Sequence, residues 1–266
     1  MPELWALAPF RRAIVALAAT GLSFPAIGTY ILALDLVSAR FAVMHASLLG
    51  AALGLLAGLP PLASGLAAGA GVARLSERGA ERASGALGLV MTLSLGLAFI
   101  VFYKSEVNAI EAFDLFWGSV LALSRPELLL TCAGAALVLV LSAVFLRGIR
   151  ALLYDRELAG VLGLPARALH YGLVMLICAG IALAMRVTGA LMVDAVTILP
   201  ALAARSMRRG LAGTLAWGAA FGLAANFGGF ALALALDLPT SPAIILVGAA
   251  LVLGTGAIER GRAKKR

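Results

Sequence analysis

The chain alternates between long apolar stretches and short segments that carry its charges. A membrane-spanning helix needs about 20 consecutive apolar residues. Read between the charged positions, the sequence predicts an all-α, polytopic membrane bundle of about eight transmembrane helices. The predicted spans are residues 13–34, 41–60, 83–103, 128–146, 168–185, 187–204, 210–236 and 238–258.

The second apolar stretch extends to residue 73 and is too long for one straight span. Pro60 and Pro61 interrupt it, and proline removes a backbone donor and clashes with the preceding helical turn. We therefore expect one span over 41–60 followed by a second, partly buried piece. That piece over 60–73 is a bend, a re-entrant segment or an extra span.

Composition strengthens the membrane assignment. Hydrophobic residues make up 62% of the 266 residues, whereas soluble domains contain about 45–50%, and the mean hydropathy is +1.04. Cys132 and Cys178 each lie in an apolar stretch, so they predict no disulfide framework. We expect residues 1–266 to form a single transmembrane domain.

The net charge of +8 reflects membrane topology and not nucleic-acid binding. If the N-terminus is cytoplasmic and the chain crosses eight times, 17 of the 21 basic residues lie on the cytoplasmic side. On the outer side of the membrane there are only Arg40, Lys104, Arg125 and Arg186. The positive-inside rule therefore predicts a multi-pass protein of the inner cell membrane with both termini cytoplasmic.

Polar residues inside the spans are the candidates for function. Asp194 lies within the otherwise uncharged stretch 187–204, and a carboxylate at the bilayer centre costs about 2.5–3.5 kcal/mol on insertion scales. We expect Asp194 to face the protein interior or a transport path. Asn226 is a second candidate for that path, although a lone Asn more often joins two helices.

Glycine and proline positions predict close packing and kinked helices. Gly50, Gly54 and Gly58 share one helical face, and small residues at this spacing let helices approach closely. We assign the same packing or gating role to Gly189 and Pro200, because broken helices are tolerated where they line a path.

Several motifs resemble the integral-membrane permeases of the ABC-3 family, which import zinc, manganese or iron. The main matches are GALMVDAVTILPALAARSMRRG (189–210) and YDRELAGVLGLPAR (154–167). LFWGSVL (115–121) and LDLPTSPAIILV (236–247) also match, and the order and spacing agree over nearly the whole chain.

The resemblance implies a homodimer of permeases, an ABC ATPase on the cytoplasmic side and an extracytoplasmic solute-binding protein. The chain has no phosphate-binding G-x-x-x-x-G-K-[ST] loop, so we expect a transport subunit and not an enzyme, with ATP hydrolysed by a partner. No cofactor is expected to stay bound. The ATPase would dock on a coupling helix over 152–164, through Asp155, Arg156, Glu157, Leu158 and Gly163.

The chain departs from the family where the second span begins. Many members read D-A-L-S-H-A there, whereas this chain reads FAVMHA (41–46), so His45 is retained and Phe41 replaces the aspartate. His45 and Asp194 could together form a transient site for Zn, Mn or Fe. Alternatively, the cargo is a metal chelate or an organic solute. In a third interpretation, His45 bonds a backbone carbonyl and Asp194 caps a broken helix or pairs with a hydroxyl such as Thr188 or Thr197.

Two other classes remain as alternatives. A channel would work without an ATPase. An intramembrane enzyme would need a catalytic constellation, and the chain has only two histidines, His45 and His170.

Overall fold

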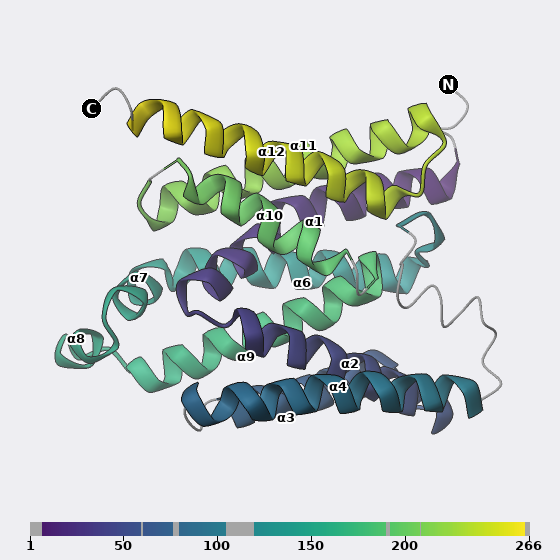
Figure 1. Cartoon of the computed structure of the whole chain (residues 1–266), viewed down its shortest axis with the longest axis horizontal. Coiled ribbons are helices and arrows are strands. Elements are labelled where there is room, and N and C mark those ends of the chain that lie inside the picture. Colours follow the sequence, from purple (N-terminus) through teal and green to yellow (C-terminus); the bar gives the residue numbers. More distant parts are fainter. Residues whose placement is uncertain are drawn as a thin grey trace.

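The computed structural model describes residues 7–59, 61–76, 80–104, 120–189, 192–207 and 209–263. Within these ranges the chain is helical and contains no strand, which confirms the all-α prediction (Figure 1). The elements are α1 (Ala8–Ala33), α2 (Val37–Leu56), α3 (Pro61–Ser76), α4 (Ala80–Lys104), η2 (Val120–Ala122), α6 (Arg125–Val144), α7 (Leu146–Tyr154), α8 (Arg156–Val161), α9 (Ala166–Thr188), α10 (Val193–Arg205), α11 (Leu211–Leu236) and α12 (Thr240–Ala263).

Seven helices in the described part of the chain are long and apolar enough to cross a membrane: α1, α2, α4, α6, α9, α11 and α12. Each corresponds to one predicted span. The predicted span 187–204 is not one long helix in the structure. Helix α9 continues to Thr188, and α10 has only 13 residues. At 1.5 Å per residue, α10 covers about 20 Å and therefore starts inside a hydrocarbon core of about 30 Å.

Glycine geometry explains the break between α9 and α10. Gly189 caps α9 with a φ of +76°, a backbone region that is strained for other residues. Its N–H donates the last i→i−4 bond of α9, to the Met185 carbonyl, and its positive φ then turns the chain out of the helix. The sequence showed an uncharged stretch here but not this positive φ.

The segment after the Pro60-Pro61 pair is a helix that folds back on α2. A Cβ added to Gly50 would lie 2.5 Å from the Ser64 carbonyl oxygen, so the two backbones touch. Gly54 also faces Ser64. Gly58 does not share this packing role, because it has open space around it and a φ of +67° in the turn.

Helix α1 runs from the η2 end of the bundle to the α7 end. Arg12, near its start, donates from Nη1 to the Leu123 carbonyl at 2.5 Å. Thr29, near its other end, shares a cavity with Arg150 and Tyr154 of α7. The expected topology placed Arg12 on the same side as α7 and opposite residue 123, and the structure differs on both points.

The described chain therefore begins and finishes at opposite ends of the bundle (Figure 1). Helix α12 returns antiparallel to α11 and ends at the α7 end, whereas α1 begins at the opposite end. The residues at the two termini lie outside the described ranges, so the expectation that both are cytoplasmic stays a prediction. Helix α3 is a further helix between α2 and α4.

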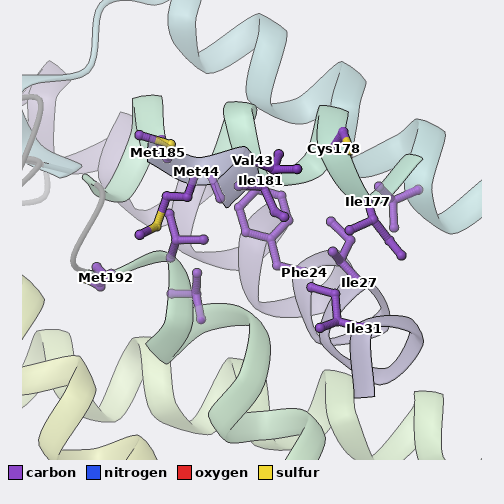
Figure 2. Packing of buried hydrophobic residues seen from close by; sticks show 14 of the residues in the cluster. Phe24, Ile27, Ile31, Val43, Met44, Ile177, Cys178, Ile181, Met185 and Met192 are labelled. Carbon is purple, nitrogen blue, oxygen red and sulfur yellow. The ribbon is translucent and has the colours of Figure 1, made fainter. Parts of the chain in front are cut away.

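The core is built around α1. Phe24, Ile27 and Ile31 are fully buried, and Phe24 lies next to Ile181 of α9 (Figure 2). Gly28 lies so close to the Thr197 carbonyl of α10 that any Cβ would overlap it. Helix α1 thus brings α2, α9 and α10 together, and these three helices carry the candidate site.

Candidate transport site

A buried ion pair joins α2 to α10. Arg40, the fourth residue of α2, donates from Nη1 to Oδ1 of Asp194, the second residue of α10. The Arg40 side chain is 5% exposed and that of Asp194 is 38% exposed. Asp194 is thus neutralised on its buried side and accessible on the other. Sequence reasoning found Asp194 but missed Arg40, which it placed in an outer loop.

The guanidinium of Arg40 also contacts Phe41, and one of its N–H donors has no hydrogen-bond partner. Its Cζ lies 4.3 Å from the centre of the Phe41 ring, within the range of a cation–π contact. Its Nε is buried and has no hydrogen-bond partner. A buried donor without a partner is uncommon and calls for an explanation, such as an acceptor that arrives with a ligand.

His45 lies one turn beyond Phe41 on α2. Its Nδ1 is 2.7 Å from the Phe41 carbonyl oxygen. Because a carbonyl only accepts, this contact assigns the proton to Nδ1 and leaves the Nε2 lone pair available in the neutral ring. A protonated His45 would also exert a favourable charge on Asp194. Arg40, His45 and Asp194 therefore form one group, which we call the α2–α10 polar cluster.

Buried methionines precede two members of the cluster in the sequence, since Met44 comes directly before His45 and Met192 comes two residues before Asp194. Met192 precedes α10 and is fully buried, and Met44 and Met185 are 7% exposed. Figure 2 shows Met44 and Met185 on adjacent helices, with Met192 below them at the start of α10. From Asp194 to the end of α10 is about 17 Å at 1.5 Å per residue. The carboxylate is therefore well inside the membrane core.

The metal-binding capacity of the cluster is small. No group of three or more His, Cys, Asp or Glu side chains comes together in the described ranges. His45 and Asp194 supply two donors, fewer than the three or four protein ligands of a stable zinc site. A site with two donors suits the transient binding of a metal ion. Of the two hydroxyls considered for Asp194, Thr197 is engaged elsewhere, because it donates to the Val193 carbonyl at 2.6 Å, and the Thr188 side chain lies outside the described residues.

Asn226 joins helices and does not line an accessible path. It is 1% exposed, and its Nδ2 donates to the Leu17 carbonyl at 2.9 Å and to Thr20 Oγ1 at 3.0 Å. These bonds tie α11 to α1. Pro200 is buried inside α10, where the missing N–H weakens the helix one and a half turns after Asp194.

The predicted coupling helix over 152–164 consists of two short helices, α7 and α8. The helix is interrupted at Asp155, whose backbone is extended. The side-chain Oδ1 of Asp155 accepts the Glu157 N–H at 2.7 Å. Asp155 therefore caps α8, whereas Glu157 is exposed. Gly163 follows with a φ of +74°. The side chains of Arg156 and Leu158 lie outside the described residues.

The inner face of α7 is anchored to the bundle. Ile149 and Leu152 are buried, whereas Val161 at the end of α8 and Leu162 directly after it are exposed apolar residues. A cavity of about 410 Å³ separates α7 from the ends of α1, α10 and α11. It is lined by Thr29, Leu32, Ala33, Arg150, Leu153, Tyr154, Ala201, Arg205, Leu211 and Thr214. The α7–α8 unit is thus fixed on one side and free on the other.

Residues 7–258 match the ABC 3 transport family. The chain belongs to this family. A probable iron transport system membrane protein of Haemophilus influenzae is 30% identical over 213 residues, which covers 79% of this chain and 78% of that protein. The manganese transport system membrane protein MntC of Halalkalibacterium halodurans is 22% identical over 253 residues. That alignment covers 94% of this chain and 87% of that protein.

A solved structure has the same fold. The structure titled PsaBC from Streptococcus pneumoniae in complex with Fab superposes with a TM-score of 0.86 at 22% identity, covering 96% of this chain and 93% of that one. The likeness establishes the multi-pass permease fold. It also agrees with the family resemblance seen in the motifs at 154–167 and 189–210.

Proposed function

We propose that this ABC 3 family chain is the membrane permease subunit of an ATP-driven importer of transition metal, with Zn, Mn or Fe as the candidate cargo. The match over residues 7–258 carries the proposal, together with relatives whose names specify manganese and iron transport. The α2–α10 polar cluster supports it, because His45 and Asp194 offer donors that such metals accept.

The α7–α8 unit is the proposed docking element for a separate ATPase. Its exposed Glu157 and exposed Val161 and Leu162 offer charge and apolar surface to a partner groove. Buried Ile149 and Leu152 on the same unit would carry a push from the ATPase into the bundle. A homodimer of permeases and an external solute-binding protein complete the proposed assembly.

The proposed orientation places the α7 end in the cytoplasm. Arg147, Arg150, Arg167, Arg205 and Arg209 lie toward that end. Helix α12 also leads there into the basic sequence RGRAKKR. The positive-inside rule then favours a C-terminus in the cytoplasm and an N-terminus outside.

The test is metal uptake into proteoliposomes that contain the chain, its ATPase and the binding protein. Radioactive zinc, manganese and iron are supplied in turn, with ATP on the ATPase side. We expect one of them to accumulate only with ATP, and not when the ATPase carries a substitution that abolishes hydrolysis. Accumulation without hydrolysis would indicate a channel, and no accumulation of any metal would refute the proposal.

A further inference from the structure

Arg40 and a metal cation need the same partner in the α2–α10 polar cluster. We propose that Arg40 is a tethered competitor of the cargo: its guanidinium holds Asp194 until a metal cation takes this carboxylate from it. Such a competitor makes metal binding weak and lets the ion pair re-form when the metal leaves. The inference rests on the proposed function, since it concerns the same transport site.

The first support is that the cluster offers one anion to two cations. Asp194 is the only carboxylate of the cluster, and Arg40 donates to its Oδ1. With Arg40 paired, the positive and negative charges cancel, whereas Asp194 without Arg40 would carry a full negative charge. A dication therefore gains less from approaching Asp194, because the guanidinium repels it from nearly the same place.

The second support is the difference in exposure within the pair. The Asp194 side chain is 38% exposed and that of Arg40 is 5% exposed, so a cation reaches the carboxylate and not the guanidinium. The neutral His45 ring offers its Nε2 lone pair as a further donor, because Nδ1 is bonded to the Phe41 carbonyl. Two donors hold a metal weakly, so the charge of Arg40 has a large influence on the affinity.

The third support is that few bonds hold the guanidinium in place. Its one hydrogen bond to the described residues goes to Asp194, and its Nε is buried without a partner. Its Cζ lies 4.3 Å from the centre of the Phe41 ring, and this cation–π contact does not depend on Asp194. Arg40 can therefore release the carboxylate and keep its contact with the ring.

The same arrangement favours release of the metal. Once a metal has taken Asp194, Arg40 is a buried cation without its counter-ion, which is strongly unfavourable. This cost lowers the net free energy of metal binding and disappears when the metal leaves and the ion pair re-forms. No covalent bond forms or breaks, because two cations exchange on one carboxylate.

The alternative is that Asp194 bridges the two cations, with Oδ1 on Arg40 and Oδ2 on the metal. Arg40 would then orient the carboxylate for the metal, and removal of Arg40 would weaken metal binding. Bridging would keep a buried guanidinium directly beside a dication, which Coulomb repulsion disfavours. Competition predicts the opposite change, so the direction in which the affinity moves distinguishes the two roles.

The test measures binding of radioactive Mn²⁺ to the purified permease–ATPase complex by equilibrium dialysis. The solute-binding protein and nucleotide are omitted because each binds Mn²⁺ itself. We expect Arg40→Gln to bind Mn²⁺ more tightly than the wild type by roughly tenfold or more, because a positive charge beside the carboxylate is removed. Adding Asp194→Asn to Arg40→Gln should abolish this gain, since the gain requires the carboxylate.

Three further variants make the result specific. Arg40→Met keeps an apolar stem without the charge, so it should show the same gain even if Arg40→Gln does not fold. Arg40→Lys keeps a positive charge and should bind Mn²⁺ as weakly as the wild type. Arg167→Gln removes an exposed arginine outside the cluster and should leave Mn²⁺ binding unchanged.

A gain in affinity separates competition from structural damage, which lowers affinity. Unchanged or weaker Mn²⁺ binding in the uncharged variants would overturn the inference. A gain that appears in Arg40→Lys, or that persists after Asp194→Asn, would overturn it as well. Any of these results would leave the proposed function standing if ATP-driven metal uptake is observed, whereas absence of that uptake refutes the proposed function itself.

Discussion

Breaking the Arg40–Asp194 pair should cost different amounts depending on which partner is removed. Asp194→Asn keeps the side-chain shape but leaves the guanidinium, at 5% exposure, without a counter-ion. Arg40→Gln instead leaves a carboxylate that is 38% exposed, which water can solvate. The difference in exposure predicts that Asp194→Asn is the more destabilising substitution.

The expected magnitudes follow from the burial of each group. Removing one partner of a buried pair costs about 3–5 kcal/mol, which applies to Asp194→Asn. Arg40→Gln should cost about 1–3 kcal/mol, the range for leaving a polar group without its hydrogen bond. The double variant contains no charge in the cluster, so its stability should return to within about 1 kcal/mol of the wild type.

The assay is thermal unfolding of the detergent-solubilised chain, with the three variants compared in one double-mutant cycle. A matched control is Asp237→Asn, because Asp237 is exposed and its φ of +52° is one that Asn tolerates. Additive losses in the double variant, or equal losses in the two single variants, would refute the argument that burial sets the cost.

Three further predictions concern packing and docking. Gly28→Val should destabilise the chain by about 1–3 kcal/mol or more in thermal unfolding, because its Cβ overlaps the Thr197 carbonyl; Gly88→Val, in open space, is the control and should leave stability unchanged. Asn226→Leu should cost about 1 kcal/mol by the same measurement, because it loses two bonds to α1; no loss would contradict that role. Glu157→Arg should abolish co-purification of the ATPase with an unchanged Tm, and retained association would argue against docking on α8.

The length and composition of the apolar stretches were sufficient to predict most of the fold. Seven predicted spans correspond to α1, α2, α4, α6, α9, α11 and α12, because a run of about 20 apolar residues has few alternatives in a membrane. The break at Gly189 and the helix after Pro61 were harder to predict. Both depend on backbone geometry, which the composition of an apolar stretch does not specify.

The candidate site was only partly predictable. Asp194 was evident as a lone carboxylate in an uncharged stretch, and His45 from its place in the FAVMHA motif. Arg40 was not, because 154 positions separate it from Asp194 and charge counting assigned it to a loop. Asn226 carried the same polar signal as Asp194, and only its contacts with Leu17 and Thr20 revealed a role in packing.

The most direct test is whether metal passes the α2–α10 polar cluster. ATP-driven metal uptake is measured in proteoliposomes for the wild type and for a His45→Ala, Asp194→Ala double variant. Uptake is divided by the amount of assembled complex, and basal ATP hydrolysis is measured to check that the double variant still assembles with its ATPase. We predict that the double variant loses uptake by roughly tenfold or more, since the cargo loses both donors. Equal uptake by the two proteins would contradict the account.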